Sequence, residues 1–134
     1  MQTFLPYPNI KKSLKVLDSR RLGKQRVEAF QILNVILDRT KTKGWRNHPA
    51  VKMWKNYPNA LKLYFNEAVR EWISRGYVNN MKNERIRGKI KIPIWFGDKK
   101  FHSSHKSNLL RKDSKYYSRF KWKEPHNLEY FWPL

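Results

Sequence analysis

The chain has 134 residues, and its 30 Lys and Arg against 10 Asp and Glu give a formal net charge of +20. A charge of this size predicts a polyanionic partner. The 40% hydrophobic and 15% aromatic content is too high for a disordered basic tail, so we expect the charge to cover a folded core. The length fits one domain over residues 1–134.

The composition also excludes several classes of protein. Without cysteine, neither a disulfide framework nor a thiolate metal site is available. No stretch approaches the roughly 20 apolar residues of a membrane span, and the N-terminus lacks the pattern of a secretory signal. We expect an intracellular protein, in the cytoplasm or nucleoid or in a virion, without a membrane partner.

The basic residues fall in three blocks, at 1–28, 82–91 and 99–123. Binding to a membrane surface favours one amphipathic helix with clustered cations. A groove built from distant segments suits nucleic acid better. The predicted partner is therefore double-stranded DNA.

The predicted fold is mainly all-α, a compact bundle of about four helices with long loops and an extended aromatic C-terminal tail. Residues 1–16 contain Pro6 and Pro8 and predict an extended arm. Asp18 is a candidate N-cap for an amphipathic helix over 19–39, whose apolar face has helical spacing. A short helix is expected over 49–56, with Pro49 near its first position.

A further helix is predicted from Pro58 to about Arg75, before Gly76. Residues 79–100 lack a helical period and predict a long loop with a short strand at Ile90–Ile94. The last helix is expected over about 104–119, before the aromatic tail. Long loops in compact domains are more often functional than idle.

Glu28 is unusual on the first long helix, because it shares a sector with Arg21, Lys24 and Gln25. Further along the same sector, Ile32 and Val35 indicate that protein covers this side. Glu28 would then lie at the mouth of a cleft. The alternative is a surface carboxylate paired with Lys24 one turn away.

A dense group of hydroxyl, amide, imidazole and cationic side chains surrounds the start of the predicted last helix. Such donors suit phosphate oxygens. The alternative is a helix cap with a solvated basic face. No carboxylate or cysteine completes a metal site with the two histidines, so we expect no metal and no cofactor. The group comprises His102, Ser104, His105, Ser107, Asn108, Arg111 and Lys112.

The aromatic residues divide into two sets. Trp54, Trp72, Tyr64 and Phe65 fall in helical stripes and are expected in the core. A second set is interleaved with Lys and Arg, where stacking on bases is the alternative to burial. This second set comprises Trp95, Tyr116, Tyr117, Trp122, Tyr130, Phe131 and Trp132.

Several motifs together resemble a known family. They are Met1 to Pro8 (MQTFLPYP), Leu17-Asp18 with Arg21 to Glu28 (RLGKQRVE), Trp45-Arg46 with His48 to Val51, Met53-Trp54, Phe101-His102 with Ser104-His105, Ser107 to Lys112 (SNLLRK), and Tyr130 to Pro133. The group of small bacterial and viral proteins that they resemble is classed with the pyrimidine-dimer DNA glycosylases, relatives of phage endonuclease V.

The resemblance implies a helical enzyme that removes ultraviolet-damaged pyrimidines and cuts the abasic site without a metal. It implies an N-terminal amine as nucleophile and a helix glutamate as acid/base, which here is Glu28. The nucleophile would be the amine of Met1, because the large Gln2 should prevent removal of the methionine. It further implies that Arg21 and Gln25 line the same pocket and that Lys112 binds a phosphate. Further candidate DNA contacts in the same motifs are Lys24, Arg26, Arg46 and His48. The alternative is a non-catalytic protein that coats or packages DNA on the same scaffold.

Overall fold

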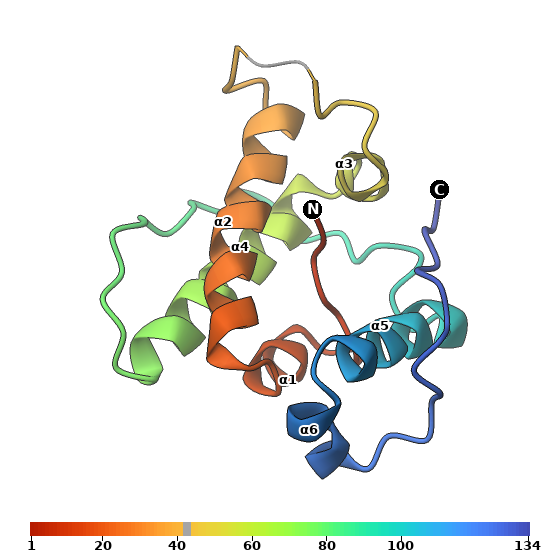
Figure 1. Cartoon of the computed structure of the whole chain (residues 1–134). Coiled ribbons are helices and arrows are strands. Elements are labelled where there is room, and N and C mark those ends of the chain that lie inside the picture. The colour runs from red at the N-terminus through yellow and green to blue at the C-terminus, as the bar shows by residue number, and fades with distance from the viewer. Residues whose placement is uncertain (42–43) are drawn as a thin grey trace.

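The computed structural model describes residues 1–41 and 44–134 and is helical, with no strand in these ranges. This confirms the all-α class. The longest helices are α2 (Ser19–Ile36), α4 (Pro58–Ser74) and α5 (Lys99–Lys112) (Figure 1). The shorter ones are α1 (Ile10–Lys15), α3 (Pro49–Trp54) and α6 (Ser114–Tyr117), followed by a 3-10 turn over Ser118–Phe120.

The helix starts follow from capping side chains. The Asp18 carboxylate accepts from the Arg21 N–H at 3.3 Å, so the predicted cap of α2 is confirmed. The imidazole of His48 caps α3, ahead of Pro49 in the first helical turn. Asp98 caps α5 and therefore starts this helix five residues earlier than predicted.

Two further boundary predictions were wrong. The N-terminal arm is extended only as far as Asn9, whose side chain accepts from the Lys12 N–H at 2.9 Å and starts α1. The predicted last helix is interrupted at Asp113, where φ is −153° and a separate short helix begins. The loop predicted over 79–100 is present but ends at Asp98, where α5 begins, and within the described ranges its isoleucines form no strand.

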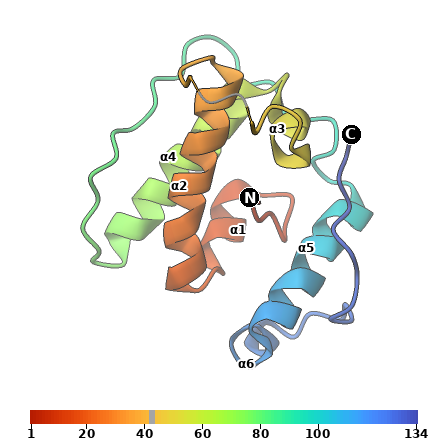
Figure 2. The same cartoon turned by 45° about the horizontal axis from the view of Figure 1, so that its top comes forward.

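The core lies where α2 packs along α4, with α1 against α4 and α3 against α2. Leu22 and Leu33 of α2 and Phe65 of α4 are fully buried there. Gly23 permits a close approach of the two helices, because a Cβ at this position would lie 2.9 Å from the Trp72 ring. The N-terminus lies between α2 on one side and α3 and α5 on the other (Figures 1 and 2).

The C-terminal tail runs back along α5. The Leu128 N–H donates to Ser107 Oγ at 2.9 Å, and the Phe131 N–H donates to Ser104 Oγ at 3.2 Å. Of the aromatic residues with two possible uses, Trp95 and Tyr117 are buried in the core. Among the described residues, no helix is both long and apolar enough to cross a membrane.

Candidate active site

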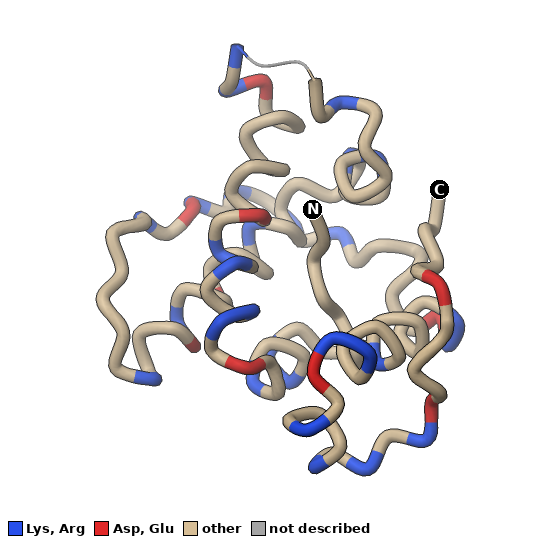
Figure 3. The backbone as a smooth tube through the Cα atoms, viewed as in Figure 1, with Lys and Arg blue, Asp and Glu red and all other residues tan. Residues whose placement is uncertain are grey.

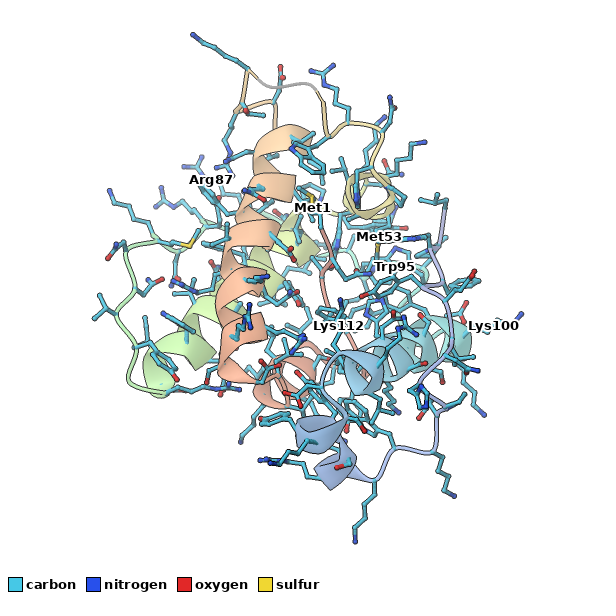
Figure 4. All side chains as sticks on the ribbon, in the orientation of Figure 1. Met1, Met53, Arg87, Trp95, Lys100 and Lys112 are labelled. Carbon is cyan, nitrogen blue, oxygen red and sulfur yellow. The ribbon has the colours of Figure 1, made fainter. Side chains whose placement is uncertain are left out.

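A pocket of about 380 Å³ lies between α2, the N-terminal segment, the end of α5 and the tail. This volume is within the range of small-molecule sites. Met1 and Lys112 lie on the same side of α2 in Figure 4. The lining residues are Met1, Gln2, Phe4, Arg20, Arg21, Lys24, Gln25, Glu28, Lys112 and Tyr130. We call this the N-terminal pocket.

The N-terminal segment reaches the pocket through the protein interior. Residues 2–6 are buried, so their backbone groups need partners inside the protein. The Phe4 N–H donates to Gln25 Oε1 at 2.8 Å, and the Phe4 carbonyl accepts from the Tyr64 hydroxyl at 2.9 Å. Trp54 Nε1 donates to Thr3 Oγ1 at 2.9 Å. These bonds fix the path of the chain up to its first residue.

Two histidines of α5 hold the backbone of Leu5. The Leu5 N–H donates to His105 Nδ1 at 2.8 Å. His102 Nε2 accepts from the Gly97 N–H at 2.9 Å, so the His102 proton is on Nδ1, which donates to the Leu5 carbonyl at 2.7 Å. Burial lowers the pKa of His105 to about 3 and also lowers the pKa of His102. Both rings are therefore neutral at pH 7.

Glu28 is held by two N–H donors on one carboxylate oxygen. Its Oε2 accepts from the Gln2 N–H at 3.2 Å and from Gln25 Nε2 at 3.3 Å. Gln25 thus links the carboxylate to the N-terminal segment through its own Oε1. Glu28 is partly buried, and no ion pair joins it to Lys24 among the described residues. The cleft hypothesis for Glu28 fits this arrangement better than the surface-pair alternative.

The pocket is strongly cationic around its one carboxylate. Arg20, Arg21, Lys24 and Lys112 line it, and Glu28 is the only acid among its described lining residues. Arg21 is oriented by an ion pair of 3.2 Å with Asp18. Such a concave surface attracts an anion and leaves a single acid/base group beside it.

The Asp18 carboxylate also contacts the Tyr117 hydroxyl, which ties α2 to α6 beneath Arg21. Burial acts to raise the pKa of Asp18, but the hydrogen bonds from Tyr117 and Arg21 outweigh it and lower that pKa.

Burial, opposed by Arg111 and assisted by Glu28, raises the pKa of Tyr130 to about 12. The Tyr130 phenol therefore remains a hydrogen-bond donor at neutral pH.

His48 lies near the amine of residue 1. Burial and the positive N-terminus together lower the pKa of His48. Its Nδ1 accepts from the Ala50 N–H at 3.0 Å, and its ring packs against Trp45 and Trp132. His48 is therefore neutral at pH 7, and it lies outside the lining of the N-terminal pocket.

Two arginines that are predicted to contact DNA lie outside the N-terminal pocket. Arg26 is on the α4 side of α2, with its guanidinium 4.3 Å from the Trp72 ring and 2.7 Å from Asn79 Oδ1. It binds the protein and does not line the pocket. Arg46 is exposed and pairs with Asp38 at 3.3 Å, also outside the pocket lining.

The polar cluster on α5 has a structural role that the sequence did not reveal. His102, Ser104, His105, Ser107 and Asn108 are all buried. Their hydrogen bonds are made to the N-terminal segment, to α5 itself and to the tail. A phosphate cannot reach these donors, so their predicted contact with DNA is corrected to support of the site.

The last two cations of that cluster differ from each other. Arg111 donates to the carbonyls of His126 and Leu128 and thereby anchors the tail. Lys112 lines the N-terminal pocket. Of the predicted α5 group, Lys112 alone among the described residues lies in the pocket lining.

Three lining residues, Gln2, Phe4 and Arg20, are absent from the predicted site, whereas Tyr130 belongs to the aromatic set for which stacking on bases or burial is expected. Arg20 had a usable signal, because it precedes Lys24 and Glu28 at four-residue intervals on one helix face. Phe4 and Tyr130 are brought together by tertiary structure, with ring centroids 6.3 Å apart. No spacing in the sequence indicates that contact.

The fold and the site define a basic helical protein with a single carboxylate in an anion-attracting pocket that the N-terminus enters. The sequence model of the pyrimidine dimer DNA glycosylase family matches residues 1–85, and the chain belongs to this family. The matched range contains α1 to α4 and the α2 side of the pocket. No curated protein and no solved structure matches the chain.

Proposed function

We propose that the protein is a metal-independent DNA glycosylase and abasic-site lyase that acts on damaged duplex DNA in the N-terminal pocket. The amine of residue 1 is the nucleophile, and Glu28 is the acid/base. The observation that carries this assignment is that the Gln2 N–H, one residue from the amine, donates to Glu28 Oε2 at 3.2 Å. Both groups line one cationic pocket.

The chemistry begins with attack of the free amine on C1′ of the damaged nucleotide. The C–N bond to the base breaks, and the base leaves with the bonding electron pair. Loss of the amine proton and opening of the sugar ring give a Schiff base. α-Amino groups in general titrate at about 7.7–8.0 and lysine side chains at about 10.4, so a chain terminus provides more free amine at neutral pH.

Glu28 removes the C2′ proton that the Schiff base acidifies. The electron pair of that C–H bond then forms the C2′–C3′ double bond, and the 3′ phosphate leaves. Both hydrogen bonds to the carboxylate use Oε2, and none reaches Oε1 within the described ranges. Oε1 is therefore the oxygen available to accept the proton.

The cations of the pocket bind the phosphates beside the damaged nucleotide. Arg20, Arg21 and Lys24 occupy one face of α2, and Lys112 approaches from the end of α5. Phe4 and Tyr130 provide aromatic surface for an extruded base. A damaged base costs less to extrude, because its stacking is already impaired.

Borohydride trapping tests the proposal on duplexes that contain a thymine dimer or an abasic site. We expect a covalent adduct located at residue 1 by mass spectrometry, which also establishes the mature terminus. N-terminal acetylation should abolish the adduct. Glu28→Gln should retain trapping on abasic DNA but lose strand scission, whereas Glu129→Gln, an exposed charge-matched control, should retain both.

The alternative is a non-catalytic protein that coats DNA. The net charge of +20 favours it, because it exceeds what one lesion pocket requires. Under this alternative, the protein binds undamaged DNA tightly but forms no adduct at residue 1 and cuts no strand. That combination of results would refute the enzymatic proposal.

A further inference from the structure

A second cationic surface lies on the loop after α4. Arg85, Arg87, Lys89 and Lys91 are exposed, and we call them the basic ridge. Glu84 is the one acid between residues 82 and 97. Its two carboxylate oxygens each accept from the Arg39 guanidinium at 3.2 Å. No acidic side chain pairs with a ridge cation in the described part of the chain.

The backbone of this loop is held against α4. The Asn66 side chain accepts from the Glu84 N–H at 2.7 Å and donates to the Glu84 carbonyl at 2.9 Å. Lys62 Nζ donates to the Arg85 carbonyl at 2.9 Å. Asn59, Lys62 and Asn66 lie at helical spacing on one face of α4. The loop therefore has a defined path although it contains no helix or strand.

A glycine allows the tightest of these attachments. Gly88 has φ +83°, a left-handed conformation that favours glycine. With this bend, the carbonyls on both sides converge on Asn59 Nδ2, at 2.9 Å from Arg87 and 3.0 Å from Lys89. Because the backbone carbonyls are bound to α4, the ridge side chains are left exposed to solvent.

The ridge is separate from the N-terminal pocket. The two share no residue, and the ridge backbone is bonded to α4 through Asn59 and Lys62. Arg87 appears on the opposite side of α2 from Met1 and Lys112 in Figure 4. Figure 3 shows Lys and Arg both on this loop and along α2.

We propose that the basic ridge binds the phosphate backbone of a second DNA segment while the first occupies the N-terminal pocket. Two ridge cations precede the bend at Gly88 and two follow it, and all four are exposed to phosphates. Ile92 and Ile94 beside the ridge are also exposed, but they do not form the amphipathic helix that a lipid surface requires. The family acts on DNA, which favours nucleic acid as the occupant.

The test compares two charge-matched variants of the full chain. The ridge variant carries Arg85→Gln, Arg87→Gln, Lys89→Gln and Lys91→Gln. The control carries Lys11→Gln, Lys15→Gln, Lys52→Gln and Lys55→Gln, which are exposed positions outside both surfaces. Circular dichroism and urea unfolding verify that each variant folds. Short undamaged duplexes, too short to wrap around the protein, are the probe.

Analytical ultracentrifugation at low salt counts the duplexes bound to each protein molecule. We expect two for the wild type and the control, and one for the ridge variant. For the one duplex that the ridge variant still binds, the slope of log affinity against log salt should match the slope for the first duplex of the control. Two duplexes bound equally to the ridge variant and to the control would overturn the proposal.

Two further measurements distinguish DNA from lipid at the ridge and separate ridge binding from catalysis. If the ridge variant loses binding to phosphatidylserine vesicles but still binds two duplexes, the ridge is a lipid surface and the proposal fails. The ridge variant should form the same borohydride adduct at residue 1 as the control, because the ridge lies outside the N-terminal pocket. The ridge proposal therefore does not depend on the proposed lyase chemistry, and either can fail alone.

Discussion

His105 accepts a hydrogen bond from the backbone N–H of Leu5, 100 residues earlier in the chain, at 2.8 Å. His102 holds the carbonyl of the same residue. The two rings thereby position the buried segment that carries the chain terminus into the N-terminal pocket. His105 accepts from Leu5 and His102 accepts from the Gly97 N–H, and both bonds require a neutral ring, so the stability of the site depends on pH.

Acidification should therefore destabilise the protein. The pKa of His105 is lowered from 6.5 in the unfolded chain to about 3 by burial, so between these values the unfolded state binds a proton that the folded state does not. His102 shifts in the same direction. The free energy of unfolding should fall by about 1.4 kcal/mol per pH unit below pH 6.5 for His105 alone.

Urea unfolding at about pH 7 and about pH 4.5 measures this loss. His126→Gln, which alters an exposed histidine, should leave the pH dependence unchanged. His105→Asn should lower stability at neutral pH and flatten the pH dependence. Equal stability of the wild type at both pH values would contradict the assignment.

Gln25 should support both the fold and the site. Gln25→Met keeps the approximate volume but leaves the buried Phe4 N–H without its acceptor, which costs about 1–3 kcal/mol. It also removes one of the two donors that orient Glu28. The free energy of unfolding measured in urea and the rate of strand scission should both fall. Gln31→Met, on an exposed position of the same helix, should change neither.

Gly23→Ala should destabilise the protein although alanine favours helix. The gain in helix propensity is about 1 kcal/mol. The new methyl group would lie 2.9 Å from the ring of Trp72, which is held by Arg26 on one face, by stacking with Tyr77 and by donation to the Val78 carbonyl. Overpacking of this kind costs about 1–3 kcal/mol and should outweigh the propensity.

Thermal or urea unfolding of a double-mutant cycle tests this reason. In Trp72→Phe the ring is smaller, so adding Gly23→Ala should cost less than it does in the wild type. An identical cost in both backgrounds would show that the close contact with Trp72 is not the cause.

Lys24 and Arg26 provide a matched pair on one helix with different expected effects on DNA. Lys24 lines the pocket, whereas Arg26 is engaged with Trp72 and Asn79 on the other side. Lys24→Gln should reduce the slope of log affinity against log salt by about 0.9, the value for one phosphate contact. Arg26→Gln should leave the slope unchanged and lower stability. The opposite pattern in the salt titration would place the DNA on the other face of α2.

The parts of the fold that depend on local chemistry were predictable. The Asp18 cap and the apolar stripe through Leu22 and Leu33 define α2, and Glu28 was recognised as a carboxylate in a basic sector. α1 was missed because Pro6 and Pro8 suggested an extended chain, although Asn9 is a favourable N-cap. Such signals lie within a few residues of the element that they define.

The polar side chains of α5 were misread for a different physical reason. His105 and Ser107 have the composition of a phosphate site, but their partners are backbone groups of Leu5 and Leu128. Sequence shows the donors and acceptors of a helix and not the remote backbone that satisfies them. Arg26 illustrates the same limit. Lys24 and Arg26 are two positions apart and therefore lie on nearly opposite sides of α2, and only the packing of the helix shows that Lys24 faces the pocket.

The buried course of residues 2–6 has a practical consequence for any chain joined ahead of Met1. Because these residues are fixed by Gln25, Tyr64 and the α5 histidines and Met1 lines the N-terminal pocket, an added N-terminal peptide would begin in that pocket. A purification tag placed there would obstruct the pocket and would convert the amine that we propose as the nucleophile into an amide. Leu134 is 73% exposed, so a tag at the other end leaves the pocket open.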